Sequence, residues 1–344
     1  MPNSDGTPHS GMAGWNSGMA GWNGRVEPEK GGELMQRLPV GVRTLNRVEP
    51  GSVPADYRRI GVEPLGMTLG AVITGVDLSA PLDDELFAEI DLAFKEWKVI
   101  VLPDQDITLE QQGAFASRWG DVVEDSLPRQ VANGGRIMPL PRVVDNVLPF
   151  TRDGVVVGLE NMWHVDGTYR EAPVLGTMLR AVDVPPIGGD TMFADMAAAY
   201  DNLDPAIQER VEGLWARHDW SAGSYADKYA ANLDEYRAVV PPVRHPVVLR
   251  HPRTGRMTIF VNRGFVRNII GIPPEESDEL LEILCHQADV PEYQVRIRWE
   301  PNLLVLWDNY AVQHYAVNDY WPQTRTLVRA TIDAGVATGV IERS

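Results

Sequence analysis

The pattern of apolar and polar residues predicts a helix, a buried strand and a second helix in the first third of the chain. From Asp83 to Trp97, apolar residues recur at helical spacing, which indicates a helix with one buried face. Val99 to Leu102 are all apolar and predict a buried strand. Thr108 and Gln111 have the spacing of a capping box, so a second helix is expected to begin there and to run to about Trp119.

Short apolar or alternating segments dominate the rest of the chain, and helical patterns are few. Strands are predicted within or near Val62–Val76, Val155–Leu159, Leu175–Val182, Val247, Ile259, Gln294–Trp299, Leu303–Trp307 and Arg325–Ile332. Helices are predicted at Asp195–Leu214, with a break near Asp204, and at Pro274–Gln287. Many short strands with few helices favour an α+β, mostly β fold, namely a jelly-roll barrel buttressed by helices.

The first 58 residues differ from the rest in composition. They are rich in Gly, Pro, Asn and Ser, and the run SGMAGWN at residues 10–16 is repeated letter for letter at residues 17–23. Such a segment has few ways to bury a core. Residues 1–58 are therefore predicted to be a flexible low-complexity tail, and residues 59–344 one folded domain, to which the candidate catalytic residues below belong. A segment that binds a partner or closes over a pocket is the alternative for the tail.

Composition and charge narrow the classes of function. The 344 residues are 44% hydrophobic, which suits a globular core, and no run is long enough for a membrane helix. The net charge of −17 argues against nucleic acid as a partner. The N-terminus lacks an export-signal pattern, and the single cysteine, Cys285, suits a reducing cytoplasm, where we expect the protein to act. Cys285 lies in a helical pattern and is expected to be a buried structural thiol.

The sequence His164-Val165-Asp166 suggests a metal site when it is read with His314. At strand spacing the side chains of His164 and Asp166 point to the same side. Two imidazoles and one carboxylate hold Fe(II) and leave three coordination positions open. A keto acid can fill two of them and O2 the third. Alone, a His-X-Asp pair often arises by chance, and a single histidine is more often structural.

Two arginines follow on one predicted strand face. Arg325, Leu327, Arg329 and Thr331 alternate along the segment Arg325–Ile332 and would share a side. Buried unpaired charges are costly, so an interior face with two arginines is expected to receive anions, although structural ion pairs are the alternative. Because both arginines follow His314 in the sequence, the whole set of residues is harder to explain by chance than the His-X-Asp pair alone.

With these residues in this order, the chain resembles the taurine dioxygenase family of Fe(II)- and 2-oxoglutarate-dependent oxygenases, which includes aryloxyalkanoate dioxygenases and alkylsulfatases. The resemblance spans about Val62 to Ile332. Its spacings are specific, because Thr191 follows Asp166 by 25 residues and the two arginines follow His314 by 11 and 15. The matching runs are Asn161–Tyr169, Gly188–Phe193, Phe260–Phe265 and Leu306–Ala316.

The resemblance implies a double-stranded β-helix, Fe(II) held by His164, Asp166 and His314, and 2-oxoglutarate as cosubstrate. It implies that Arg325 grips the C5 carboxylate of 2-oxoglutarate and that Thr191 donates a hydrogen bond to it. The succinate and CO2 that result would accompany hydroxylation of an unactivated C–H bond. Asp308 and Asn309 are candidates either to orient His314 or to close the turn after a strand.

Candidate substrate residues are also implied by the resemblance. Arg329 matches the arginine that holds the sulfonate of taurine, and Trp220 and Phe265 match aromatic positions of the substrate pocket. Core packing is the alternative for both aromatics. Glu160 replaces an asparagine near the amine of taurine, and no histidine lies between His9 and His164, so taurine is disfavoured as the substrate. Arg329 with Glu160 suggests an anion with a separated amine, unless Glu160 faces solvent or pairs with an arginine.

The predicted function is hydroxylation of a small anionic metabolite: a sulfonate, phosphonate, sulfate ester, aryloxy acid or amino acid. A jelly-roll binding or regulatory protein with a vestigial metal site is one alternative. Another is an iron enzyme that uses the same three ligands without a keto acid, against which Arg325 and Thr191 speak. Besides substrate and O2, no nucleic acid or membrane partner is expected, and association into a homo-oligomer is left open.

Overall fold

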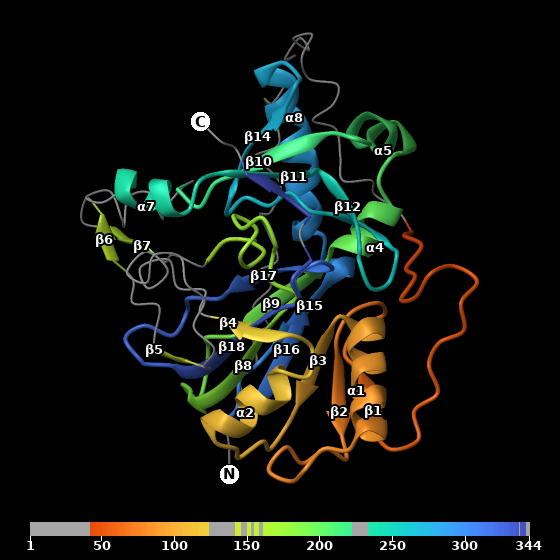
Figure 1. The fold of residues 1–344 in the computed structure, drawn as a ribbon, viewed down its shortest axis with the longest axis vertical. Coiled ribbons are helices and arrows are strands. Elements are labelled where there is room, and N and C mark those ends of the chain that lie inside the picture. Colours follow the sequence, from red (N-terminus) through yellow and green to blue (C-terminus); the bar gives the residue numbers. More distant parts are fainter. Residues whose placement is uncertain are drawn as a thin grey trace, which may run out of the picture. The chain divides into compact units, whose positions relative to one another are not determined.

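A large, mostly antiparallel sheet lies in the lower half of the view in Figure 1. Its strand order is β1-β2-β3-β16-β8-β18-β4, with β5 also paired to β18, and only β2 and β3 run parallel. The strands are β1 (Gly61–Pro64), β2 (Ala71–Thr74), β3 (Val99–Leu102), β4 (Asp121–Val123), β5 (Arg142–Asp145), β8 (Gly176–Asp183), β16 (Leu304–Asp308) and β18 (Thr326–Asp333). The strands predicted within Val62–Val76 and at Val99–Leu102, Leu175–Val182, Leu303–Trp307 and Arg325–Ile332 are confirmed to within one or two residues at each end. The strands β4 and β5 were not predicted, because their segment was expected to be loop-rich.

This computed structural model describes residues 42–123, 142–145, 150–152, 155–157, 161–221, 233–336 and 338–341. Residues 38–344 form one compact unit. Much of the loop-rich segment predicted between Gly120 and Leu159 lies outside the described residues, although it contains the paired strands β6 (Phe150–Arg152) and β7 (Val155–Val157). The strand predicted at residues 155–159 is confirmed over residues 155–157 as β7, and its last two residues lie outside the described residues.

A second sheet of three strands packs against one face of the large sheet. Its order is β15-β9-β17, from β15 (Gln294–Ile297), β9 (Thr191–Asp195) and β17 (Val312–Ala316). A shared core joins the two sheets, and the rings of Phe193 and Trp307 lie 5.4 Å apart within it. The alternation of β18 is confirmed, because Leu327 lies in this core whereas Ala330 and Ile332 lie in a different one.

Two helices cover the opposite face of the large sheet. The helix α1 (Asp84–Trp97) begins at the cap residue Asp83, whose carboxylate accepts a hydrogen bond from the Leu86 amide. The helix α2 (Leu109–Ala116) begins with the predicted capping box at Thr108 but ends three residues earlier than predicted. Phe94 and other apolar side chains of these helices pack with residues of the central strands in a second core.

The remaining helices and strands form a third packed region. The helices α4 (Met196–Asp201), α5 (Pro205–Val211) and α8 (Pro274–Cys285) pack on the small sheets β14-β10-β11-β19 and β12-β13. Its strands are β10 (Trp215–His218), β11 (Val243–Pro246), β12 (Val248–Arg250), β13 (Met257–Ile259), β14 (Val266–Ile270) and β19 (Val340–Ile341). The predicted break between the first two helices is confirmed, and Cys285 is buried as predicted. A further helix, α7, spans Leu233–Val239.

Residues 43–57, at the end of the predicted tail, are hydrogen-bonded to the folded unit. Glu96, which is buried in α1, accepts hydrogen bonds from the Arg47 side chain at 2.6 Å, the Ala55 amide at 2.9 Å and the Tyr57 hydroxyl at 2.9 Å. The guanidinium of Arg47 also lies over the Trp97 ring. Residues 1–41 lie outside the described residues, so a division of the chain at residue 58 stays a prediction.

Two truncations test where the tail ends. Deleting residues 2–41 is expected to leave the melting temperature nearly unchanged, because every contact of Glu96 described above is kept. Deleting residues 2–58 removes three donors from a buried carboxylate and should cost about 3–5 kcal/mol in the free energy of unfolding. Thermal denaturation of both proteins measures the difference, and equal melting temperatures would show that these contacts do not stabilise the fold.

The described architecture is thus mostly β with helices on its faces. Among the helices that the structure describes, none is long and apolar enough to cross a membrane.

Candidate metal centre and cosubstrate site

Two histidines from distant parts of the sequence lie opposite each other in an isolated β-bridge. The backbones of His164 and His314 exchange two hydrogen bonds, of 3.0 and 2.9 Å. Residues directly opposite in such a bridge project to the same side. The neighbouring residues Trp163 and Tyr315 pack ring to ring at 5.6 Å, and the Trp163 indole donates to Asp289 at 2.9 Å. These contacts of the neighbouring residues hold the backbones of both histidines in place.

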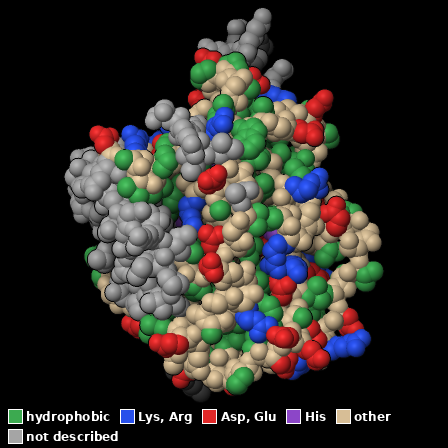
Figure 2. Space-filling view, in the orientation of Figure 1, with side chains coloured by type: hydrophobic (Ala, Val, Ile, Leu, Met, Phe, Trp, Pro, Cys, Tyr) green, Lys and Arg blue, Asp and Glu red, His purple; other side chains and the backbone are tan. Residues whose placement is uncertain are grey.

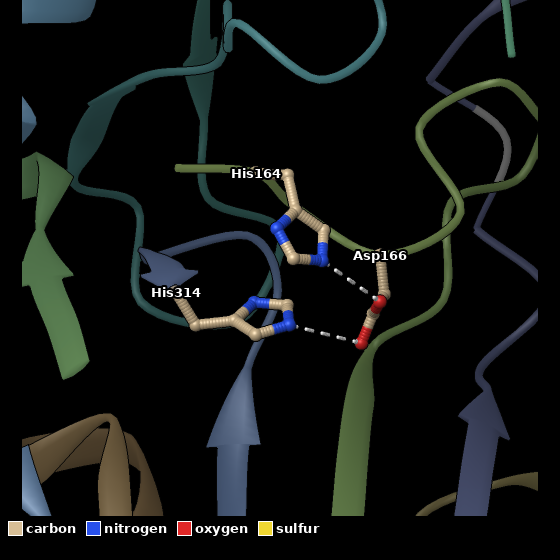
Figure 3. A group of neighbouring side chains, drawn as sticks. All are labelled: His164, Asp166 and His314. Carbon is tan, nitrogen blue, oxygen red and sulfur yellow. Dashed lines mark ion pairs between the residues drawn. The ribbon is translucent and has the colours of Figure 1, made fainter. Parts of the chain in front are cut away.

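Asp166 completes a buried group of three metal-binding side chains (Figure 3). One ligand atom from each residue lies within 4.8 Å of the others. His164 Nε2 is 3.9 Å from Asp166 Oδ1, and His314 Nε2 is 3.7 Å from Asp166 Oδ2. The carbonyl of Met162 accepts a hydrogen bond from His164 Nδ1 at 2.8 Å, which leaves the Nε2 lone pair directed to the site. The donor set and spacing therefore fit a metal ion.

The electrostatics of the site place Asp166 and His314 in the protonation states that a metal requires. Burial alone would raise the pKa of Asp166, but the positive charge of Arg329 and the adjacent imidazoles outweigh it and lower this pKa below its usual value. Burial and the neighbouring His164 lower the pKa of His314 to about 3. An ionised carboxylate and a neutral imidazole are the forms that bind metal.

A chain of buried side chains holds the Asp166 carboxylate. The Thr177 hydroxyl donates to Asp166 Oδ2 at 2.7 Å, and the Asn309 side-chain amide donates to Thr177 Oγ1 at 3.1 Å. The Trp307 indole in turn donates to the Asn309 side-chain oxygen at 3.1 Å. Asn309 thus supports Asp166, and the expectation that it orients His314 is wrong. No sequence motif marked Thr177, because its partners are distant in the chain.

Asp308 closes a turn, which was the other expectation for this residue. Its Oδ1 accepts a hydrogen bond from the Tyr310 amide at 2.9 Å. Its Oδ2 lies 2.9 Å from Nε2 of the buried His251. The Asp308 carboxylate therefore joins β16 to the turn that follows β12 and does not support His314.

The two predicted cosubstrate residues are buried close to the same loop. Arg325, just before β18, donates from its guanidinium to the Gly189 carbonyl, two residues from Thr191. The Trp299 indole donates to Thr191 Oγ1 at 3.0 Å. Because the Thr191 oxygen already accepts this bond, its hydroxyl hydrogen can be donated to an incoming anion. Trp299 ends a predicted strand but carried no sequence signal for this contact.

The predicted substrate residues differ in how they relate to the metal-binding group. Arg329 contacts it directly, since its Nη2 lies 2.7 Å from Asp166 Oδ2. The Phe265 ring lies edge-on to the His164 ring at 6.3 Å. Trp220 is buried and donates to the Val240 carbonyl at 2.8 Å, and its place in a substrate pocket stays a prediction. Glu160 lies outside the described residues.

Gly264 approaches the metal-binding group so closely that a side chain there would displace a ligand. A Cβ atom added to Gly264 would lie 2.8 Å from His164 Cβ. We therefore expect Gly264→Ala to shift His164 and to weaken metal binding by roughly 10-fold or more, as losses of supporting groups do. Calorimetric titration with Co²⁺ measures the affinity. Wild-type affinity in a folded variant would show that His164 tolerates the added methyl group.

Two histidines and one carboxylate with open positions are the ligand set of non-haem Fe(II) oxygenases. Residues 61–331 match the model of the family described as taurine catabolism dioxygenase TauD, TfdA family. The chain belongs to this family.

Named relatives cover most of the chain. The (S)-phenoxypropionate/alpha-ketoglutarate-dioxygenase of Sphingobium herbicidovorans is 36% identical over 78% of this chain and 92% of its own length. The alpha-ketoglutarate-dependent sulfate ester dioxygenase of Pseudomonas putida is 35% identical over 82% of this chain and 92% of its own. The crystal structure of a taurine dioxygenase from Burkholderia xenovorans superposes with a TM-score of 0.68 at 30% identity, over 83% of this chain and 97% of that one.

Proposed function

We propose that this protein is an Fe(II)- and 2-oxoglutarate-dependent dioxygenase that hydroxylates an unactivated C–H bond of a small anionic substrate. The observation that carries the proposal is the buried group of His164, Asp166 and His314, with Arg329 in contact with it. The names of the relatives support the reaction class, since both use alpha-ketoglutarate, which is 2-oxoglutarate. The two facing sheets are consistent with a double-stranded β-helix, which we include in the proposal.

The cosubstrate would be held at two ends. His164, Asp166 and His314 would hold the iron, which would serve as the binding site for the keto-acid end of 2-oxoglutarate. Arg325 would grip the C5 carboxylate, because a guanidinium matches a carboxylate in shape and charge, and Thr191 would donate its hydroxyl hydrogen. When bound, iron and 2-oxoglutarate supply with O2 the oxidising power for C–H hydroxylation and leave succinate and CO2.

The chain's own residues would select and place the substrate. Arg329 would bind its anionic group, and Phe265 and Trp220 would give the remainder an apolar surface. Glu160 would receive an amine if the substrate carries one. Fixing one C–H bond near the reacting centre is the protein's main contribution to rate and selectivity. Sulfonates, phosphonates, sulfate esters, aryloxy acids and amino acids all satisfy the requirement for an anion.

Nucleic acid is not favoured as the substrate. The net charge is −17, whereas binding to phosphate backbones needs a basic surface. Figure 2 shows acidic and basic side chains interspersed among apolar ones on the described part of one face. A small anion needs only the local charge of buried arginines.

A substrate screen tests the proposal. The full chain with Fe(II) and 2-oxoglutarate should release succinate slowly by itself and faster with a true substrate from the five classes named above. Succinate release is compared between amine-bearing and amine-free anions, for both wild type and Glu160→Gln. This comparison shows whether the substrate must carry an amine. A binding protein with a vestigial site would release no succinate under any of these conditions, and an iron enzyme without a keto acid would turn over in the absence of 2-oxoglutarate.

A further inference from the structure

One oxygen of Asp166 accepts a hydrogen bond from a neutral donor and forms an ion pair with a charged one. The Thr177 hydroxyl and Arg329 Nη2 both lie 2.7 Å from Oδ2. Arg329 is also held by its Nε, which donates to the Thr331 hydroxyl at 3.1 Å, and all four residues are buried. Both donors therefore have fixed positions beside a metal-binding carboxylate.

The two donors should affect metal binding in opposite directions. Thr177 is neutral, and its supporting chain through Asn309 and Trp307 is neutral too, so it can orient the carboxylate without opposing a cation. Arg329 carries a full positive charge. A divalent metal on Asp166 would lie within a few ångströms of that charge, and two cations in a buried site repel each other strongly. Arg329 and the metal also share the negative charge of one carboxylate.

We propose that Arg329 opposes metal binding in the substrate-free site and that an anion bound to its guanidinium relieves this opposition. Metal and anionic substrate would then bind cooperatively, each raising the affinity for the other by the same factor. The anion half of this inference rests on the proposed function, in which Arg329 receives the substrate anion. The metal half rests only on the contact between Arg329 and Asp166. Arg329 would thereby favour full metal occupancy when substrate is present.

The metal half of the inference is tested by measuring the metal affinities of variants at Arg329 and Thr177. Co²⁺ binding is measured by calorimetry in the full chain without any substrate, and circular dichroism confirms that each variant is folded. Arg329→Gln should bind Co²⁺ about tenfold or more tightly than wild type, because the repelling charge is gone. Arg329→Lys keeps the charge and should stay close to wild type. Arg329→Met, also uncharged, serves if the glutamine variant fails to fold.

Two matched threonine variants should show either weaker Co²⁺ binding or no change in it. Thr177→Val removes the neutral donor with little change in volume and should weaken Co²⁺ binding about 10- to 100-fold. Thr258→Val is the control, since Thr258 is equally buried but donates to the Leu249 carbonyl in β12. Unchanged or weaker Co²⁺ binding in the uncharged Arg329 variants would overturn the inference and would make Arg329 a second positioning residue.

The anion half of the inference is tested by measuring Co²⁺ affinity with and without hexyl sulfate as the anion. Saturating hexyl sulfate at matched ionic strength should tighten Co²⁺ binding to wild type by roughly 5-fold or more. In Arg329→Gln the effect should disappear. An equal effect in both proteins, or none in wild type, would overturn the anion half. The proposed reaction is tested separately by succinate release, so failure of the coupling and failure of the function are distinguishable.

Discussion

Replacing His314 with alanine is expected to reduce metal binding and succinate formation to background while the chain stays folded. The side chain supplies one of three ligands, and Nε2 of His314 lies 3.7 Å from Asp166 Oδ2. The bridge to His164 is made by backbone atoms, which alanine retains. His314 Nδ1 has no hydrogen-bond partner among the described residues, so the substitution strands no buried polar group there.

The cost to stability should come from packing. The His314 ring lies 4.9 Å from the Trp307 ring and 6.2 Å from the Phe193 ring, so a small cavity should lower the melting temperature moderately. His286→Ala is the matched control, because that side chain is 42% exposed at the end of α8. It should retain Co²⁺ binding and activity. Near-normal activity of folded His314→Ala would remove this residue from the site.

The second large effect is expected at Arg325. Arg325→Gln should raise the 2-oxoglutarate concentration required for half-maximal activity by roughly tens- to thousands-fold, because loss of a buried charge-assisted partner costs about 2–5 kcal/mol. Metal binding in the absence of 2-oxoglutarate should be unchanged, since Arg325 is bonded to the Gly189 carbonyl and not to a metal-binding side chain in any contact described. The KM for 2-oxoglutarate and the Co²⁺ affinity are the two measurements.

Arg180→Gln provides the control for loss of a buried arginine. Arg180 lies on β8 and contacts Gln112 at 3.3 Å, on the side of the sheet that α2 covers. Its substitution should affect stability but not the requirement for 2-oxoglutarate. If Arg325→Gln leaves the KM unchanged, Arg329 or another cation must hold the C5 carboxylate.

Local chemistry explains which elements could be predicted from the sequence. The start of α1 at Asp83 and the capping box of α2 depend on residues three positions apart, so the sequence alone suffices to predict them. The alternation in β18 likewise predicts that Arg329 shares a face with Leu327. The strands β9 and β17 were not predicted, because neither Thr191–Asp195 nor Val312–Ala316 is an uninterrupted apolar run.

The same distinction applies to the site. His164 and Asp166 are two residues apart, and their association with His314 and the arginines could be inferred from residue type and order. The supporting contacts could not, since Thr177 and Trp299 carry side chains common in any core. Their function depends on partners, Asn309 and Thr191, that only the fold brings to them. The ion pair between Arg329 and Asp166 could not be predicted from the sequence for the same reason.

We expect this chain to couple Fe(II) bound by His164, Asp166 and His314 to oxidation of 2-oxoglutarate. The most direct measurement is the release of labelled CO2 from C1 of 2-oxoglutarate by the purified full chain, as Fe(II) is added up to one equivalent. We predict release that rises with Fe(II), requires O2 and stops when a chelator removes the metal. No release at full Fe(II) occupancy, or release that persists with the chelator, would contradict the claim.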